Sequence, residues 1–472
     1  MKQVFFALSL LLVSIFILPQ CSDAPKEKKA KYVFYFIGDG MGVNQVNGTE
    51  MYLAELDGKI GVKPLNFTQF PVVNFATTYS RYNSVTCSAA AGTALATGEK
   101  TKNGTIGMDS LRQSPLYSVA VKAKNAGKKV GITTSVSVDH ATPAAFYAHQ
   151  PDRNMYYEIA TDLAKAGFDL HAGSGFLQPK SKTDSTATEI YTILQDSGYV
   201  VIKGVKEFQK KAANNNKVVF IQEKGQDDCL PYAIDRQEGD LTLAQITENA
   251  VNFLSKDNDK GFFLMVEGGK IDWACHSNDA ATVFHEVIDM SEAIQVALNF
   301  YQQHPDETLI VITADHETGG IALGTGKYAL NLQALQNQKV SKENLTAQLQ
   351  ELRKEKNNKV AWEDVRTLLA ENLGFWTNVP LNEKQENKLK EVYNQTFKQG
   401  NVKMEENLYS QNELMAEEAV KILDAIAMVG WTSGGHSAGV VPVYAIGAGS
   451  QLFSGKLDNI DIPKKIAEAA GY

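Results

Sequence analysis

Carboxylate and imidazole side chains gather at the ends of short apolar runs in this 472-residue sequence. Three runs are followed by Asp, Glu or His within a few residues, and a fourth run is preceded by His. The side chains concerned are Asp39, Glu267, Asp272, His276, Asp315, His316 and His436. Any one of them alone is typical of a helix cap, a turn or a structural histidine. Together they predict a metal site, because carboxylate and imidazole ligands without thiolate suit zinc at hydrolytic sites.

A possible nucleophile lies elsewhere, at the start of a run of small residues from Ser88 to Gly98. The run predicts a helix that Gly98 ends, because glycine readily adopts the left-handed conformation past a helix C-terminus. Ser88 is then either an ordinary cap residue or a nucleophile favoured by the helix dipole and a metal. The cap is the better interpretation in isolation, and the metal site favours the nucleophile.

A third group of residues could bind an anion. His140 and Thr142 lie close together, and Arg153 follows them. Arginine binds phosphate with two parallel hydrogen bonds, although a surface ion pair would equally explain it. The net charge of −8 argues against a nucleic-acid polymer as partner, since such binding needs a basic surface. A small phosphate ester remains compatible, because metal ions and one arginine can neutralise it.

The elements that must position these side chains alternate along the chain. Apolar runs predict strands at 32–37, 130–134, 218–222, 261–266, 308–313 and 441–446. Helical patterns lie between them, at about 118–126, 155–166, 243–254 and 280–302. This alternation predicts an α/β fold with a doubly wound, mostly parallel central sheet and helices on both faces. Ligands bind at the carboxyl ends of the strands in such sheets, where the acidic groups lie.

One stretch interrupts the alternation, from about 327 to 428. Helical patterns follow one another there without a good strand, and Leu345, Leu349 and Leu352 fall on one helical face. We interpret the stretch as a helical insertion before His436, and not as an independent catalytic domain.

The N-terminus predicts export. Residues 1–20 have the short apolar core of a secretory signal peptide, and Cys21 follows as in a bacterial lipoprotein signal. Residues 21–30 are lysine-rich and predict a solvated tether. We expect a cell-envelope protein, anchored through a lipid on Cys21 or otherwise periplasmic or secreted. Three cysteines remain, an odd number that excludes a complete disulfide framework.

Six blocks of the sequence resemble the alkaline phosphatase family, and they occur in that family's order. The blocks are Gly38-Asp39-Gly40-Met41-Gly42, Ser88-Ala-Ala, Thr142-Pro143 with Arg153, Glu267…Asp272…His276, Ala314-Asp315-His316 and Gly435-His436. The resemblance runs over residues 31–472, with the insertion as an elaboration. It implies hydrolysis of phosphate monoesters to an alcohol and inorganic phosphate through a phosphoserine on Ser88.

The resemblance also implies three metal ions and a phosphate-binding arginine. Asp272, His276 and His436 would hold a first zinc. Asp39, Asp315 and His316 would hold a second, next to Ser88. A third ion, typically magnesium, would be held by Asp39, Thr142 and Glu267, and Arg153 would bind two phosphate oxygens.

Three positions next to the substrate depart from the best-known bacterial pattern. His140 stands where that pattern has an aspartate beside the magnesium, and Trp273 stands where it has a lysine near the phosphate. Both leave the identity of the third ion open. Cys87 replaces the aspartate that would steady the arginine, so we expect a freer Arg153 and a looser hold on phosphate.

Other classes of protein compete with this interpretation. A phosphodiesterase or sulfatase on a related scaffold is the enzymatic alternative, but Arg153 favours the two free oxygens of a monoester. The sulfatase pattern Cys/Ser-x-Pro-x-Arg is absent around Cys87. A metal- or phosphate-binding envelope lipoprotein is the other alternative, and it would have no need of Ser88. Monomer and homodimer both stay open.

Overall fold

The computed structural model describes residues 29–225, 228–326, 328–399, 404–406 and 408–472. The predicted signal peptide, Cys21 and most of the predicted tether lie outside these residues. Ala30, which the sequence placed in the tether, is only 1% exposed, and its N–H donates to the Ala469 carbonyl at 2.8 Å. The folded body therefore already includes Ala30. Within the described ranges, no helix combines the length and the apolar character needed to cross a membrane.

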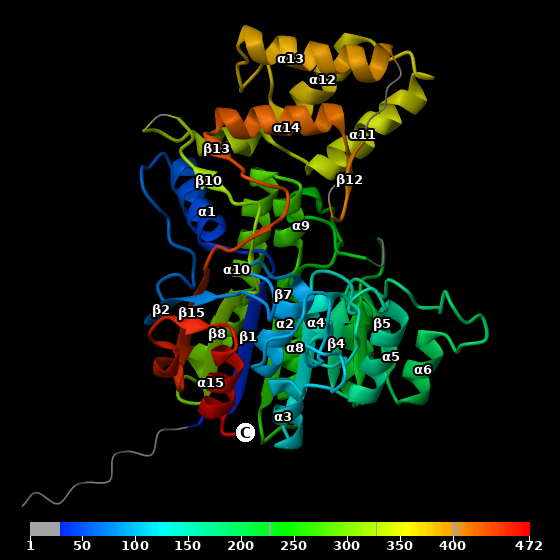
Figure 1. Cartoon of the computed structure of the whole chain (residues 1–472), viewed down its shortest axis with the longest axis vertical. Coiled ribbons are helices and arrows are strands. Elements are labelled where there is room, and N and C mark those ends of the chain that lie inside the picture. Colours follow the sequence, from blue (N-terminus) through cyan, green and yellow to red (C-terminus); the bar gives the residue numbers. More distant parts are fainter. Residues whose placement is uncertain (1–28, 226–227, 327, 400–403, 407) are drawn as a thin grey trace, which may run out of the picture.

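A ten-stranded sheet forms the centre of the body (Figure 1). Its strands are β1 (Tyr32–Gly38), β2 (Val72–Thr77), β3 (Lys129–Thr134), β4 (Leu170–Gly173), β5 (Val200–Lys203), β6 (Val218–Ile221), β7 (Phe262–Gly268), β8 (Thr308–Ala314), β15 (Val441–Gly447) and β16 (Leu457–Asp458). Their order is β16-β2-β15-β8-β1-β7-β3-β4-β6-β5. Only β15 runs antiparallel to its neighbours in this sheet, which confirms the predicted mostly parallel α/β architecture.

The central strands were predictable because they are buried on both faces. Every residue of β1, β7 and β8 is buried, and their sequences are nearly continuous apolar runs, as expected for parallel strands covered on both sides. The sequence interpretation missed β2, β4, β5 and β16. β4, β5 and β16 have four residues or fewer, and β2 alternates between more and less exposed positions, so none gives a long apolar run.

Helices surround the sheet, and the four helices predicted for the body are all present. The body helices are α1 (Val43–Leu56), α2 (Ser88–Thr97), α3 (Val119–Asn125), α4 (Ala141–Ala144), α5 (Tyr156–Ala166), α6 (Ile190–Asp196), α7 (Gly204–Lys211), α8 (Leu243–Ser255), α9 (Lys270–His276), α10 (Ala280–Gln303) and α15 (Asp461–Ala470). α4 and α9 are short, and each directly follows a strand or turn at the same edge of the sheet.

The insertion stacks its helices beyond one end of the sheet, at the top of Figure 1. They are α11 (Lys342–Glu355), α12 (Trp362–Leu373), α13 (Glu383–Tyr393) and α14 (Leu414–Ile426). Leu345 and Leu349 are fully buried, as their helical spacing predicts, and Leu352 is half-buried. The expectation of no strand was wrong, because β11 (Met404–Glu406) and β12 (Gln411–Glu413) form an antiparallel pair. Strands of three mostly polar residues give no apolar pattern to detect.

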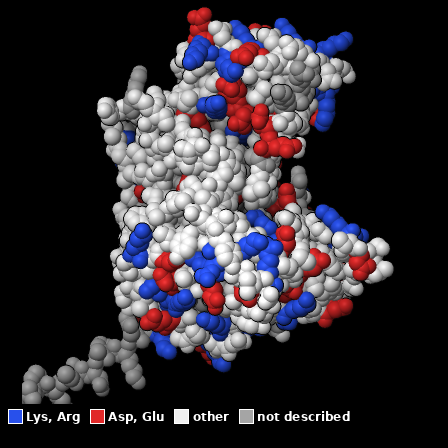
Figure 2. All heavy atoms as spheres, viewed as in Figure 1, with Lys and Arg blue, Asp and Glu red and all other residues white. Residues whose placement is uncertain are grey.

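Two short antiparallel pairs connect the insertion to the body. β10 (Ala322–Leu323) pairs with β13 (Val429–Gly430), and β9 (Glu317–Thr318) pairs with β14 (His436–Ser437). The chain therefore leaves the body and returns to it through neighbouring strands. Figure 2 shows the surface indented between the insertion above and the body below, with Lys and Arg interspersed among Asp and Glu on this face.

Candidate active site

The carboxyl ends of β1, β7 and β8 meet at one edge of the sheet. The last residue of β1, Gly38, is in parallel register with the ends of both neighbours, so Asp39 and Asp315 emerge side by side. The Gly40 N–H donates to Asp315 Oδ1 at 3.1 Å. Gly40 has a φ of 69°, and a Cβ there would lie 2.8 Å from Asp272 Oδ1. Glycine is thus required for the two acidic segments to approach each other.

A first group of candidate ligands contains Asp272, His276 and His436. One turn of α9 brings Asp272 Oδ2 within 3.3 Å of His276 Nε2, as the spacing of four predicts. The two histidine Nε2 atoms lie 3.1 Å apart. Their Nδ1 atoms face the Gly434 and Thr86 carbonyls at 2.6 and 2.9 Å. A proton on each Nδ1 leaves both Nε2 lone pairs facing the same point, which is how histidines present themselves to a metal.

A second group contains Asp39, Asp315 and His316, all fully buried. His316 Nε2 lies 3.5 Å from Asp39 Oδ1 and 3.2 Å from Asp315 Oδ2. Among the described residues, neither oxygen of Asp39 has a hydrogen-bond partner, and nor does Asp315 Oδ2. Burial and the nearby Asp272 charge raise the pKa of Asp315 to about 7. Buried, unpaired carboxylates of this kind are unfavourable until a cation joins them.

A third group contains Asp39, His140 and Glu267. Burial raises the pKa of Glu267 to about 8, against the opposing effect of the hydrogen bond that the Thr134 hydroxyl donates to it. Thr142 lies on α4 at this site, as the resemblance implied. Burial lowers the pKa of His140 to about 3, so its imidazole is neutral and can act as a ligand. The sequence placed His140 beside this ion, and the structure adds its ring to the ligand group.

Ser88 is the first residue of α2 and lies next to the second group. Its Oγ is buried and 3.3 Å from His316 Nε2. The helix ends at Gly98 in the left-handed conformation, as predicted. Small residues are needed throughout because α2 lies against α4: a Cβ on Gly92 would be 3.2 Å from the Thr142 Cα. Because α2 and α4 are in close contact, Ser88 at the start of α2 lies near the third group, which Thr142 of α4 adjoins.

Thr318 links the first two groups and was not predicted from the sequence. Its hydroxyl donates to Asp272 Oδ1 at 2.5 Å and lies 3.2 Å from His316 Nδ1. The neighbouring Glu317 belongs to none of the metal groups and instead accepts a hydrogen bond from Gln45 at 2.8 Å. A threonine two residues after the Asp-His pair carries no distinctive signal, because threonine is common at strand positions.

Arg153 reaches the site from the loop before α5. Its Nη2 lies 3.4 Å from His140 Nε2 and donates to the Tyr409 hydroxyl at 3.2 Å. Its backbone N–H donates to the Gly104 carbonyl at 2.8 Å. The Gly104 N–H in turn contacts Cys87 Sγ at 3.1 Å, so the thiol contacts the loop beside the arginine. Tyr409, from the insertion, is a site residue that the sequence interpretation missed.

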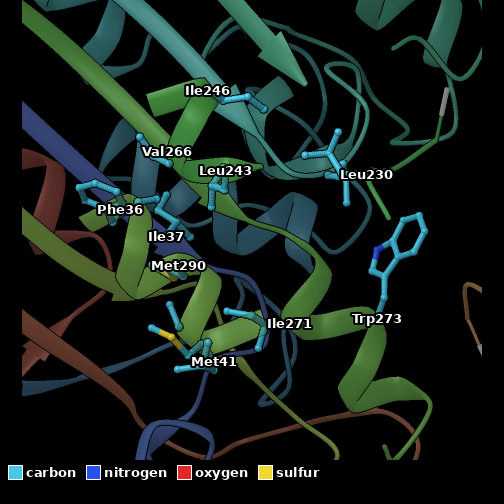
Figure 3. Packing of buried hydrophobic residues seen from close by; sticks show 14 of the residues in the cluster. Phe36, Ile37, Met41, Leu230, Leu243, Ile246, Val266, Ile271, Trp273 and Met290 are labelled. Carbon is cyan, nitrogen blue, oxygen red and sulfur yellow. The ribbon is translucent and has the colours of Figure 1, made fainter. Parts of the chain in front are cut away.

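Trp273 lies on α9, directly after the candidate metal ligand Asp272. Figure 3 shows its ring apart from the other labelled core side chains. The Tyr409 ring stacks on it with centroids 4.5 Å apart and an interplanar angle of 9°. The Lys270 ammonium is 4.6 Å from the Trp273 centroid. The indole thus joins the body to the insertion.

The remaining candidates lie outside the three metal groups of the described residues. They are His149, His171, His285, His304, Cys229 and Cys275. The three described cysteines are free thiols, and Cys275 is buried beside Gln45.

This fold and these ligand groups define an α/β protein with three candidate sites for divalent metal ions, one of them beside a buried serine. The family model described as alkaline phosphatase matches residues 30–172 and 181–472. The chain therefore belongs to the alkaline phosphatase family, and its activity is hydrolysis of phosphate monoesters. Membership also implies divalent metal ions, for which the three groups are the candidate ligands.

Known relatives resemble the chain over almost its entire length. Alkaline phosphatase 3 of Bacillus subtilis (strain 168) is 32% identical, with 96% of this chain and 93% of that protein covered. The crystal structure of a cold-active alkaline phosphatase from the psychrophile Shewanella sp. is 29% identical at a TM-score of 0.77, covering 93% of this chain and 99% of that one. A histidine-to-aspartate mutant of TAB5 alkaline phosphatase, with magnesium bound in its M3 site, is 26% identical at a TM-score of 0.66 and covers 95% and 99%.

Proposed function

We propose that the chain hydrolyses phosphate monoesters in two steps through a phosphoserine on Ser88. The Ser88 oxygen loses its proton and bonds to phosphorus while the bond to the alcohol oxygen breaks, and the alcohol takes up a proton. Water then cleaves the phosphoserine and releases inorganic phosphate. The position of Ser88 carries this proposal, because its Oγ is buried at a helix N-terminus 3.3 Å from a candidate metal ligand. Two in-line displacements predict net retention at phosphorus.

Zinc in the first and second groups fits the side chains present. The unpaired buried oxygens of Asp39 and Asp315 lack positive partners among the described residues. The facing Nε2 atoms of His276 and His436 offer lone pairs to a common point. Bound divalent ions would hold the attacking and leaving oxygens and neutralise phosphate charge. The protein's own contribution is to fix the ligands and exclude water from them.

The third group would hold its ion with a nitrogen as well as oxygens. Asp39, Glu267 and Thr142 supply the oxygens that magnesium prefers, and His140 adds an imidazole that favours zinc. The TAB5 protein, in which aspartate replaced a histidine, holds magnesium in its M3 site. We infer that His140→Asp would shift the third site of this chain toward magnesium, and metal analysis of the two forms tests this.

Arg153 binds the two phosphate oxygens that the metals leave free. Its guanidinium is planar and can donate two parallel hydrogen bonds to one phosphoryl group. A monoester offers these oxygens, which supports small phosphate monoesters as substrates.

The cell envelope is the proposed location. The apolar run before Cys21 supports export, and Cys21 supports a lipid anchor. Cys21→Ala should abolish lipid labelling and release the protein from membranes. Retention of the lipid label in that variant would contradict the anchor.

Rapid acid quenching with labelled substrate tests the covalent step. We expect the label on the peptide that contains Ser88, and none in Ser88→Ala. Ser84→Ala is the matched control, since Ser84 lies on the same segment but is exposed. Label on another residue, or full activity in Ser88→Ala, would contradict the assignment.

A further inference from the structure

Arg153 lacks the partner that usually holds a phosphate-binding arginine. The ion pairs of the described arginines involve Arg236, Arg353 and Arg366, each with a carboxylate, and not Arg153. A guanidinium without a fixed partner samples several orientations, and an oriented one loses less entropy on binding phosphate. The side chain that meets Arg153 is therefore important for affinity.

Tyr409 occupies this position. Its hydroxyl accepts the hydrogen bond from Arg153 Nη2 at 3.2 Å. Burial raises the pKa of the phenol, so it remains neutral at any working pH of the enzyme.

Body residues hold the Tyr409 ring from several directions. It stacks on Trp273, and its centroid lies 5.4 Å from that of His276 and 5.8 Å from that of His140. Tyr409 itself comes from the turn between β11 and β12 of the insertion. The hydroxyl is thus fixed relative to the metal ligands, although the chain segment that carries it belongs to another part of the molecule.

Cys87 does not take this role. Its Sγ contacts the Gly104 N–H at 3.1 Å, and a neutral thiol makes only weak hydrogen bonds. The sequence suggested that the arginine would consequently be freer. The structure instead places Tyr409 as the residue that holds Arg153.

We propose that Tyr409 is a positioning residue that orients Arg153 toward phosphate, in the role that an aspartate at position 87 has in the best-known bacterial pattern. The proposal rests on the proposed phosphate-binding role of Arg153. It makes the insertion part of the phosphate site, so the strength of phosphate binding depends on a hydroxyl from outside the sheet.

Tyr409→Phe is the direct test, because it removes the hydroxyl and keeps the stacked ring. We expect the dissociation constant for inorganic phosphate, measured by calorimetry on metal-loaded protein, to rise about tenfold. KM should rise by a similar factor while kcat stays within about twofold. Tyr328→Phe is the matched control, since Tyr328 is fully exposed near the base of the insertion. Zinc content should be unchanged in both variants.

Rescue separates positioning from a structural role. Cys87→Asp supplies a carboxylate beside Arg153, so it should restore phosphate affinity in the Tyr409→Phe protein and change the wild-type protein less. Unchanged phosphate affinity in Tyr409→Phe, or a loss that Cys87→Asp fails to restore, would overturn the proposal. A wild-type protein that binds phosphate but yields no phosphoserine would instead overturn the proposed covalent mechanism.

Discussion

The sheet edge and the helical insertion contribute to the active site in different ways. At the sheet edge, Asp39 and Asp315 follow adjacent parallel strands, and the register of those strands decides where the carboxylates lie. The insertion contributes Tyr409 from a short hairpin, and its position depends on a ring stack with Trp273. Metal ligands are therefore fixed by the most rigid part of the fold, and the partner of Arg153 by one of the least regular. The first arrangement determines whether the chemistry occurs, and the second how tightly phosphate is held.

Metal removal should have the largest effect, because it disables the sheet edge, which determines whether the chemistry occurs. Treatment with a strong chelator should lower kcat/KM at least about 10³-fold, since bound metals supply several kcal/mol of transition-state stabilisation. Adding zinc should restore activity, as followed with an aryl phosphate. Full activity in protein shown by elemental analysis to hold no metal would contradict the role given to the strand ends.

Leu349→Ala tests whether the insertion is a separate unit of stability. Leu349 is fully buried within the insertion, and its truncation should destabilise that region by about 2–5 kcal/mol. Hydrogen exchange should speed up in α11–α14 while β1, β7 and β8 remain protected. Ile310→Ala, in the centre of β8, is the matched change in the sheet and should reduce protection there. Equal loss of protection everywhere in Leu349→Ala would show that the two regions unfold together.

Thr318→Val tests the connection within the sheet edge. The hydroxyl contacts both Asp272 and His316, and loss of such supporting hydrogen bonds lowers metal affinity about 10–100-fold. Zinc competition with a chelating dye measures this. Thr325→Val is the control, since Thr325 is exposed. Wild-type zinc affinity in Thr318→Val would mean that the ligands need no such support.

The pH dependence of the junction should give a smaller effect. Asp424 of α14 is buried, faces Asp279 and Lys342, and accepts from Trp431 Nε1 at 2.8 Å. Burial raises its pKa to about 8 from the ordinary 3.8. Between these values the folded state binds a proton that the unfolded state lacks, so the free energy of unfolding falls as pH rises.

Asp424→Asn removes this titration. Raising the pH from 7 to 8 should lower the wild-type free energy of unfolding by about 1 kcal/mol more than that of the variant. Denaturant unfolding of the metal-loaded proteins at the two pH values measures the difference. Identical pH dependence in both proteins would exclude a titrating Asp424.

The sequence predicted the part of the fold that follows from continuous burial. β1, β7 and β8 are nearly continuous apolar runs, and polar side chains stand at or just after their ends, so strands and metal ligands could both be recognised. β4 and β5 could not, because β4 is Leu-His-Ala-Gly, with a histidine inside it, and β5 is only partly buried and ends in a lysine. The hairpin that carries Tyr409 was also missed, because its strands are short and mostly polar.

Two residues of the site were not predicted from the sequence, and the reason is the same for both. Tyr409 acts through Arg153, which lies 256 positions earlier in the sequence, and Thr318 donates to Asp272, which lies 46 positions earlier. Single-residue chemistry gives no reason to choose one tyrosine or threonine over another. Only the packing of the insertion on α9 brings the phenol to the arginine.

The pairing of β10 with β13 also bears on how this protein can change over evolutionary time. Ala322 lies opposite Gly430, so about a hundred residues of chain start and finish at adjacent points. Lengthening or replacing such a segment adds little loop-closure entropy, which grows only with the logarithm of length. Lineages can therefore exchange the insertion without disturbing the strand register that holds the metals. Each exchange would give the same catalytic centre a different partner for its arginine, and so a different affinity for phosphate.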